Sequence, residues 1–257
     1  MYNCDFRLET GDKNAGTVYL PDKNANNLPV IIYCHGWKGR RQLWTPTEKL
    51  CQTAIDNNMA LVTFDFFGCG ETGGDYGQMT YLRWKQNLSD ILDFIENQPF
   101  ADKNKIGCYA FSSGSTAALR LAAEDERIAF VVSVGTCIST HIFMNSGSPA
   151  KWLSDNLETL VNGGLVNDFG IDFCRDTVSN APIHTMKNIK CPVLFLQGTS
   201  DNPYRIADAR MGYQIMSRNG LNASHIEIDN GTHELENVID EAMKYMFDWL
   251  LPLWRII

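Results

Sequence analysis

Residues 106–118 read IGCYAFSSGSTAA. The apolar run at residues 106–110 is typical of a buried strand, and the small residues after it favour a helix that begins after a sharp turn. Within this stretch Ala110, Ser112 and Gly114 match a relaxed GxSxG motif, in which a strained turn lifts the serine hydroxyl above a sheet. Small residues are needed around the serine because larger side chains would collide across the turn. The alternative is an ordinary helix that the Ser112 hydroxyl caps.

The rest of the chain alternates short apolar runs with longer amphipathic segments. The runs are almost continuously apolar, as expected of strands buried on both faces of a parallel sheet, and they cover residues 30–34, 60–64, 106–110, 129–134, 192–196 and 224–228. Helices are expected at residues 45–58, 81–97, 113–123, 204–218 and 233–250. An antiparallel hairpin at the sheet edge is predicted over residues 4–9 and 17–20. This order predicts an α/β fold with a doubly wound, mostly parallel, eight-stranded sheet.

One connection is much longer than the others. Residues 135–190 separate two predicted strands, whereas a crossover takes about a dozen residues or a few more. The stretch contains large apolar side chains such as Trp152 and Phe169, so we expect it to fold as a small helical layer. We therefore predict a single α/β domain over residues 1–257, with a cap inserted after the sixth strand at approximately residues 137–188.

Composition excludes several classes of function. The 257 residues include 22 Lys and Arg and 30 Asp and Glu, for a net charge of −8, and the longest basic cluster is at residues 38–41. Such a chain offers no electrostatic footprint for a phosphate backbone, so nucleic acid is not an expected partner. No apolar run approaches the ~20 residues of a membrane helix, and the first residues do not resemble a signal peptide. We expect a cytoplasmic protein that has no membrane partner.

Neither the cysteines nor the glycines indicate a cofactor. No two of the eight cysteines have CxxC spacing, so we interpret them as reduced, structural residues. Gly68, Gly70 and Gly73 match GxGxxG, but no helix follows them directly, as a dinucleotide site requires. We interpret these glycines as a turn-rich loop and expect no metal and no cofactor.

A nucleophilic serine needs a base and an acid that orients the base. In a doubly wound sheet such groups gather beyond the carboxyl ends of the strands. Asp201 follows the predicted strand at residues 192–196, and His233 follows the last strand, at the start of the predicted C-terminal helix. The predicted catalytic residues are therefore Ser112, Asp201 and His233. A turn-forming aspartate and an exposed histidine at a helix start are the alternatives.

Acyl transfer also requires an oxyanion hole built from two N–H groups. One donor is expected from Ser113, directly after the nucleophile, and the other from Trp37, in the loop after the strand at residues 30–34. His35 in the same loop is interpreted as a structural residue that holds the loop in place. Arg40 and Arg41 are expected on a solvated loop, with contact to a substrate carboxylate as the alternative.

As a set, these motifs resemble the α/β-hydrolase superfamily. The segments that carry the resemblance follow the family order and are His35-Gly36-Trp37-Lys38-Gly39, Asp65-Phe66-Phe67-Gly68-Cys69-Gly70, Ala110-Phe111-Ser112-Ser113-Gly114, Gly198-Thr199-Ser200-Asp201 and Gly231-Thr232-His233. The short hairpin, the glycine-rich loop and the modest insert look most like the cinnamoyl (feruloyl) esterase and serine-aminopeptidase-like group. The sequence departs from the family's elbow at Ala110, where glycine is usual.

The resemblance implies a serine hydrolase that cleaves carboxylic esters of small molecules through an acyl-enzyme, with aromatic or short acyl groups as in cinnamoyl esters. The expected substrate-binding residues are apolar or aromatic and comprise Trp37, Phe66, Phe111, Phe143, Met144 and Trp152. For Phe66 and Trp152 a core position is the alternative. Two other functions stay open: an aminopeptidase-like amidase or thioesterase with the same three residues, and a non-catalytic ligand-binding relative. The sequence also leaves the oligomeric state open.

Overall fold

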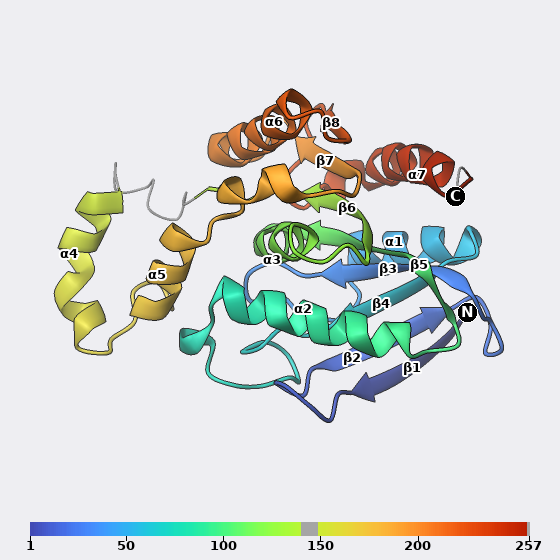
Figure 1. Ribbon diagram of the computed structural model, residues 1–257, viewed down its shortest axis with the longest axis horizontal. Helices are drawn as coiled ribbons and strands as arrows, with labels where there is room; N and C mark the ends of the chain where they lie inside the picture. The colour runs from blue at the N-terminus through green and yellow to red at the C-terminus, as the bar shows by residue number, and fades with distance from the viewer. Residues whose placement is uncertain (140–148, 256–257) are drawn as a thin grey trace.

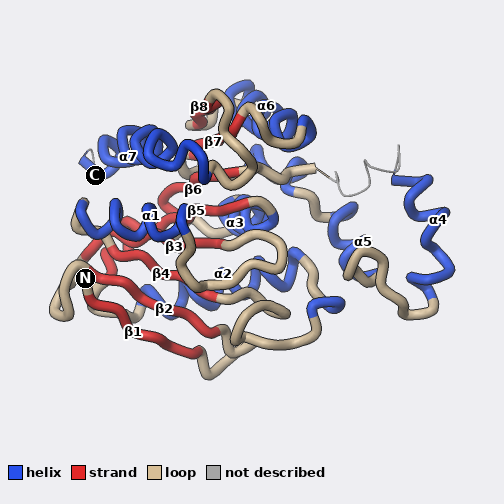
Figure 2. The backbone as a smooth tube through the Cα atoms, turned by 180° about the vertical axis from the view of Figure 1, so that it is seen from behind, coloured by secondary structure: helices blue, strands red, loops and turns tan. Residues whose placement is uncertain are grey.

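A central sheet, covered by helices on both faces, forms the body of the computed structural model, which describes residues 1–139 and 149–255 (Figures 1 and 2). Its strands are β1 (Tyr2–Arg7), β2 (Ala15–Leu20), β3 (Leu28–Cys34), β4 (Ala60–Phe64), β5 (Ala101–Phe111), β6 (Ile128–Val134), β7 (Val193–Gly198) and β8 (Ala223–Ile228). Their spatial order is β1-β2-β4-β3-β5-β6-β7-β8. β1 and β2 form the antiparallel edge, and the strands from β4 to β8 pair in parallel. The predicted fold class is confirmed.

Five helices cover the two faces of the sheet. Helices α1 (Thr45–Asp56) and α7 (Ile239–Arg255) pack on one face, and the other face carries α2 (Tyr81–Glu96), α3 (Ser113–Ala122) and α6 (Pro203–Arg218). Each face has its own apolar core, because the inner strands are buried on both sides. Short 3₁₀ turns lie in the connections: η1 (Tyr76–Gln78), η3 (Pro182–His184), η4 (Met186–Asn188) and η5 (Glu236–Val238).

The C-terminal helix differs from its prediction. It was expected to begin at His233, but α7 begins at Ile239. The backbone of Leu235 has φ of 58°, a left-handed conformation that interrupts the helical path. The segment before α7 also contains apolar residues such as Leu235, which extend the apolar pattern of the helix beyond its true start. His233 is therefore a loop residue.

The long connection between β6 and β7 contains helices α4 (Pro149–Val161) and α5 (Ile171–Ser179). Both helices stand to one side of the sheet, and α4 lies farther from it (Figures 1 and 2). The stretch has a small apolar cluster of its own, formed by Trp152, Leu160 and Cys174. The sequence predicted such a helical layer here. The role of this insert as a cap stays a prediction.

Two buried carboxylates hold the insert to the helices that cover the sheet. Asp176 of α5 accepts hydrogen bonds from Arg120 Nη1 at 3.1 Å and from the Leu82 N–H at 2.9 Å. Asp208 of α6 accepts from the N–H groups of Ile138 and Ser139 at 2.9 and 3.0 Å. Arg120 and Asp176 form a buried ion pair, and removing one partner would leave an uncompensated charge, so this contact positions the insert strongly.

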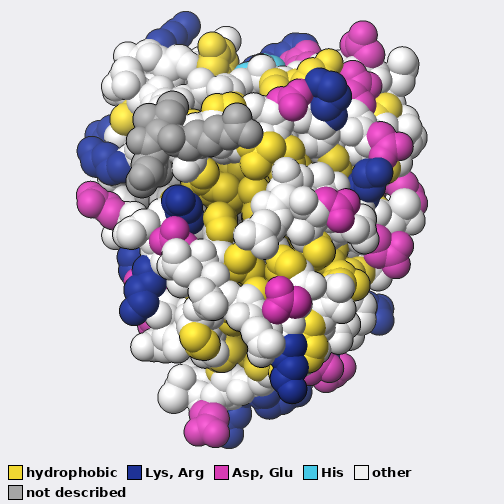
Figure 3. Space-filling model, turned by 90° about the vertical axis from the view of Figure 1, so that its right-hand side faces the viewer, with side chains coloured by type: hydrophobic (Ala, Val, Ile, Leu, Met, Phe, Trp, Pro, Cys, Tyr) yellow, Lys and Arg dark blue, Asp and Glu magenta, His cyan; other side chains and the backbone are white. Residues whose placement is uncertain are grey.

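The side of the molecule opposite the insert is a mixed surface. Hydrophobic side chains form a band across this side, and acidic and basic side chains surround the band (Figure 3). None of the helices in residues 1–139 and 149–255 is long and apolar enough to cross a membrane. None of the eight cysteines, all of which lie in these ranges, forms a disulfide bond.

Candidate active site

Ser112 lies at the tight turn between β5 and α3. Its backbone has φ of 52° and ψ of −118°, a conformation that residues other than glycine rarely adopt and that costs about 1–3 kcal/mol. The turn is held by a hydrogen bond from the Ser112 N–H to the Val134 carbonyl at 2.8 Å, and by one from the Ser115 N–H to the Ser112 carbonyl at 3.0 Å. Strained backbone of this kind occurs at functional sites, where the surrounding structure maintains it.

Gly114 explains why the turn needs small residues. A Cβ atom at this position would lie 2.2 Å from the Cys34 carbonyl oxygen and 2.6 Å from that of His35. Glycine therefore allows the start of α3 to pack directly against the carboxyl end of β3. This close approach brings the loop after β3 to the serine, because a Cβ on Gly36 of that loop would be 3.2 Å from Ser112 Cβ.

The structure brings the three predicted catalytic residues into one hydrogen-bonded chain. His233 Nε2 lies 3.0 Å from Ser112 Oγ, and His233 Nδ1 lies 2.8 Å from Asp201 Oδ2. Because an ionised carboxylate only accepts hydrogen bonds, Nδ1 carries the proton and Nε2 is left as the acceptor for the serine hydroxyl. This arrangement can move a proton from the serine to the histidine.

Asp201 is held in its ionised form. Burial alone raises the pKa of its carboxyl, but the hydrogen bond and electrostatic interaction with His233, with hydrogen bonds from Gln197 and the Asn202 N–H, outweigh burial and lower the pKa. Gln197 Nε2 donates to Oδ2 at 2.7 Å, and the Asn202 N–H donates to Oδ1 at 2.6 Å. These donors fix the carboxylate so that it orients the imidazole.

The loop that carries His233 is shaped by its own contacts. Both the N–H and the hydroxyl of Thr232 donate to Asn237 Oδ1 at 3.0 Å, which closes the turn around His233. Gly135, with φ of 57°, lies against the imidazole, and a Cβ atom there would be 2.6 Å from His233 Cε1. The end of β6 therefore provides the space that the imidazole occupies.

His35 holds the loop that follows β3. The Phe66 N–H donates to His35 Nε2 at 3.1 Å, so the proton of the neutral ring is on Nδ1, which lies 2.8 Å from the Gly36 carbonyl oxygen. Complete burial of the ring lowers the pKa of His35 to about 4, although the Gly36 carbonyl and the charge of Asp65 oppose this shift. His35 thus acts as a neutral structural residue, as the sequence indicated.

Two backbone N–H groups beside Ser112 are available to a ligand. Within residues 1–139 and 149–255, neither the Trp37 N–H nor the Ser113 N–H donates to a protein acceptor. Ser113 is the first residue of α3, where N–H groups have no partner inside the helix. These are the two donors that the sequence predicted for an oxyanion hole, and their assignment to that role stays a prediction.

The glycine-rich loop after β4 encloses a buried carboxylate. Asp65 is fully buried, and its carboxylate accepts hydrogen bonds from the N–H groups of Arg41 at 2.6 Å and Glu71 at 2.9 Å. Gly70, with φ of 48°, passes so close that a Cβ atom would lie 2.3 Å from Asp65 Cγ. The Arg41 guanidinium is also buried and pairs with Asp65 at 3.1 Å. Arg41 is therefore part of this structural network, and the prediction that it lies on a solvated loop is wrong.

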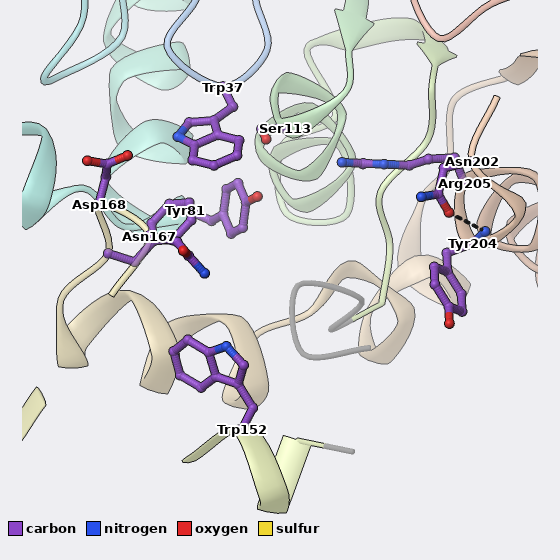
Figure 4. Close-up of a pocket in the computed structure, with 10 residues that line it drawn as sticks. Trp37, Tyr81, Ser113, Trp152, Asn167, Asp168, Asn202, Tyr204 and Arg205 are labelled. Atoms are coloured by element: carbon purple, nitrogen blue, oxygen red, sulfur yellow. Dashed lines mark hydrogen bonds between the residues drawn. The ribbon is translucent and has the colours of Figure 1, made fainter. Parts of the chain in front are cut away.

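A cavity of about 470 Å³ opens beside Ser113. Its walls come from the loop after β3, the starts of α2, α3 and α6, and the insert, through Trp37, Tyr81, Ser113, Trp152, Asn167, Asp168, Phe169, Asn202, Tyr204 and Arg205 (Figure 4). The Trp37 ring stacks on Phe169 at 5.2 Å between ring centroids. The lining is thus aromatic on one side and polar on the side of α6.

Two of the six predicted substrate-binding residues, Trp37 and Trp152, line this cavity. Phe66 does not, because its ring is fully buried and stacks on Trp84 at 4.3 Å between centroids. Phe111 packs against the His233 ring at 4.9 Å and faces a smaller cavity of about 250 Å³ on the other side of Trp37. The predicted residues Phe143 and Met144 lie outside the described residues.

Sequence reasoning missed Tyr81 and Arg205 as cavity residues. Tyr81 is the first residue of α2, and Arg205 lies in the first turn of α6, four positions after Asp201. For Arg205 the available signal was its position shortly after the end of β7, because that edge of a doubly wound sheet carries the ligand. Tyr81 offered no such signal, since a long loop separates it from the end of β4 at Phe64. Within the described ranges, no group of three or more His, Cys, Asp or Glu side chains is arranged to hold a metal ion.

The sequence profile of the family described as alpha/beta hydrolase fold matches residues 29–179, more than half of the chain. The chain belongs to the alpha/beta hydrolase fold family. The matched segment of this alpha/beta hydrolase includes the turn at Ser112 and the loop of Trp37. The superfamily indicated by the sequence motifs is thereby confirmed.

Individual proteins similar to this alpha/beta hydrolase are distant. The uncharacterized 31.7 kDa protein in the traX-finO intergenic region of Escherichia coli is 29% identical over 133 residues, which are 52% of this chain and 45% of that protein. Esterase FrsA of Serratia proteamaculans is 23% identical over 163 residues, which are 60% of this chain and 36% of that protein. The chain thus spans less than half the length of both curated relatives.

The fold is also shared with solved structures. Est1E from Butyrivibrio proteoclasticus with bound ferulic acid superposes with a TM-score of 0.69 and covers 92% of this chain and 95% of its own. The identity is 18%, so this likeness concerns the fold.

Proposed function

We propose that this alpha/beta hydrolase is a serine hydrolase that cleaves carboxylic esters. The observation that carries the proposal is the chain of contacts from Ser112 Oγ to His233 Nε2 at 3.0 Å and from His233 Nδ1 to Asp201 at 2.8 Å. A serine hydroxyl is a weak nucleophile by itself, and a hydrogen-bonded base with an oriented imidazole is the usual way to activate it.

In the proposed first step, Ser112 Oγ attacks the ester carbonyl carbon while its proton passes to His233 Nε2. The carbonyl oxygen becomes an oxyanion, which the N–H groups of Trp37 and Ser113 stabilise by hydrogen bonds. The tetrahedral intermediate then collapses to the acyl-enzyme, and the imidazolium of His233 gives its proton to the departing alcohol oxygen. Asp201 stabilises the imidazolium throughout.

In the second step, a water molecule attacks the carbonyl carbon of the acyl-enzyme. His233 Nε2 accepts a proton from the water, and the same two N–H groups stabilise the second oxyanion. Collapse of this intermediate releases the carboxylic acid, and the proton returns to Ser112 Oγ. The cycle uses only groups of this chain and water.

We infer that the acyl group is aromatic or short, as in cinnamoyl-type esters. The cavity beside Ser113 has flat aromatic walls from Trp37, Phe169 and Trp152, and such rings favour planar ligands by stacking. Its volume of about 470 Å³ is within the usual range for small-molecule sites. The name of Esterase FrsA supports ester hydrolysis, and the ferulic acid bound to Est1E supports an aromatic acyl group.

A panel of 4-nitrophenyl esters with acetyl, butyryl, benzoyl and cinnamoyl groups tests the proposal. We expect turnover by the unaltered chain and loss of at least about 10³-fold in kcat for Ser112→Ala. Ser217→Ala, which removes an exposed hydroxyl on α6, serves as the matched control and should retain full activity. A fluorophosphonate should label the unaltered chain but not Ser112→Ala. Turnover that persists unchanged in Ser112→Ala would contradict the proposal.

A further inference from the structure

Arg205 introduces a positive charge into the cavity beside Ser113. Its side chain extends from the first turn of α6 across the cavity towards Ser113, opposite Trp37 and Tyr81 (Figure 4). The guanidinium has five N–H donors. In the part of the chain that the structure describes, one hydrogen bond uses these donors, a long one of 3.4 Å from Nη1 to the Gly135 carbonyl oxygen. Most of this group therefore faces the cavity.

The charge of Arg205 has no protein counter-charge in the described ranges. No Asp or Glu carboxylate of those ranges lies within 4.0 Å of its guanidinium. Among the described residues that line the cavity, Asp168 is the one acidic residue, and it pairs with Lys38 at 2.6 Å. The nearby Asp201 is engaged by His233, Gln197 and its neighbour's N–H. Since Lys38 neutralises Asp168, the guanidinium of Arg205 is the unpaired charge among the described lining residues, in a protein whose overall charge is −8.

Arg205 lies in the first turn of α6, at the positive end of the helix dipole. The first turn of an α-helix has a partial positive charge from its unpaired N–H groups, so a cation there is unfavourable and an anion is stabilised. The α6 helix begins at Pro203, and its first turn contains no acidic residue. Arg205 and the helix terminus therefore both favour a negative group in this part of the cavity.

Tyr81 lies across the cavity from Arg205, and the positive charge of Arg205 influences the pKa of the Tyr81 hydroxyl. Burial is the main influence on the Tyr81 hydroxyl and raises its pKa, while the positive charge of Arg205 partly offsets that effect. The hydroxyl therefore stays protonated at neutral pH and can donate a hydrogen bond. The Arg205 guanidinium and the Asn202 amide on one side, with aromatic rings and the neutral Tyr81 hydroxyl on the other, suit a flat molecule that ends in a carboxylate.

We propose that Arg205 recognises an ionised carboxylate on the substrate, so that the preferred esters carry an anionic group in the part bound beside Ser113. This inference rests on the proposed ester hydrolysis, since it names the substrate class of the same site. It also assigns a specificity role to a residue that takes no part in proton transfer.

Matched substrates that differ only in charge test the proposal. The first pair is the 4-nitrophenyl esters of 4-carboxybenzoate and 4-carbamoylbenzoate, which place the charge on the acyl half. The second pair, 3-carboxyphenyl acetate and 3-carbamoylphenyl acetate, places it on the leaving alcohol. We expect kcat/KM to favour the anionic member in one pair at least.

The variant Arg205→Gln should remove this preference. A hydrogen bond to a charged group contributes enough that kcat/KM for the anionic ester should fall about 10- to 100-fold, with a change of less than about threefold for the neutral ester. Arg205→Lys should retain part of the preference because it keeps the charge but loses the planar fork. Arg210→Gln is the matched control, since Arg210 is on the same helix but pairs with Glu227 outside the cavity.

Two results would overturn the inference while leaving ester hydrolysis intact. One is equal kcat/KM for the anionic and neutral members of both pairs. The other is an equal loss for both members in Arg205→Gln, which would mean that Arg205 acts by supporting Gly135 and the adjacent His233.

A binding measurement separates this inference from the proposed reaction. Free 4-carbamoylbenzoate, titrated calorimetrically into Ser112→Ala with and without Arg205→Gln, reports the carboxylate contact without turnover. We expect affinity about tenfold or more weaker in the double variant. If no ester were hydrolysed, this difference would still support the anion site, and its absence would overturn it.

Discussion

Lys38 Nζ lies 2.6 Å from Asp168 Oδ2, so that an ion pair joins the loop beside Ser112 to the insert between β6 and β7. Next to it, the stacked rings of Trp37 and Phe169 connect the same two segments. Both side chains of the ion pair are about half exposed, at 54% and 52%. The contact therefore aligns the two walls of the cavity rather than stabilising the core.

Breaking this ion pair should affect substrate binding more than stability. We expect Lys38→Met to change the free energy of unfolding by less than about 1 kcal/mol, because exposed pairs are weak. KM should rise a few-fold, since the walls of the cavity are no longer aligned. Urea denaturation and steady-state kinetics of Lys38→Met, Asp168→Asn and the double variant measure this. Effects on KM that add fully in the double variant would contradict a direct coupling.

Gly135 should be essential for the position of the histidine. In Gly135→Ala the new methyl group would lie 2.6 Å from His233 Cε1, and displacing an imidazole by about 1 Å costs about 100-fold in rate. Gly220→Ala is the matched control, because Gly220 also has a positive φ, of 71°, but has no atom within 4 Å of the new methyl group. Both variants should lose about 1 kcal/mol of stability from backbone strain. Only Gly135→Ala should lose kcat, and equal kcat in the two variants would disprove this role.

Stability should decrease between about pH 6.5 and pH 4 because of His35. Burial lowers the pKa of His35 to about 4 in the folded state, whereas an unfolded histidine has a pKa near 6.5. Between these values the unfolded state binds more protons than the folded state, so the free energy of unfolding falls as the pH falls, by about 3 kcal/mol in total. Urea denaturation across this range measures the slope.

Two variants, one at His35 and one at an exposed histidine, test whether His35 causes this pH effect. His35→Gln keeps an acceptor for the Phe66 N–H but does not titrate, so its stability should be lower at pH 7 and vary less between pH 6.5 and 4. His184→Gln, which replaces an exposed histidine, should retain the slope. An unchanged slope in His35→Gln would show that another group is responsible.

Phe66 should matter for stability but not for substrate choice. Its ring is fully buried against Trp84, so Phe66→Leu should lower the free energy of unfolding by about 1–3 kcal/mol through lost packing. The relative kcat/KM values for acetyl, benzoyl and cinnamoyl esters should be unchanged, because the ring does not reach the cavity. Trp152→Leu is the comparison, since Trp152 lines the cavity and its loss should alter those ratios. A changed acyl preference in Phe66→Leu would contradict its assignment to the core.

Local features of this protein could be predicted well from the sequence. The turn at Ser112 is encoded within a few residues, because Gly114 alone permits α3 to approach the Cys34 carbonyl. The buried strands were recognisable because strands covered on both faces must be almost entirely apolar. The start of α7 was predicted incorrectly because the positive φ of Leu235, a residue that rarely adopts it, leaves no sign in the local pattern.

Distances between remote segments were decided by the tertiary structure. His233 is 121 positions from Ser112, and only the packing of the strands places their side chains 3.0 Å apart. The same packing buries Arg41 against Asp65, although its sequence neighbours are polar, and turns the ring of Phe66 into the core. It also leaves the charge of Arg205 facing the cavity.

The sequence by itself therefore determined the order of strands and helices along the chain, the tight turn at the serine and the choice of Asp201 and His233 as its proposed acid and base. These follow from local sterics and from hydrophobic patterning, which depend on neighbouring residues. The tertiary structure alone decided which aromatic and charged side chains line the cavity. That choice depends on how α2, α6 and the insert pack around the carboxyl ends of the strands, where residues far apart in the chain meet.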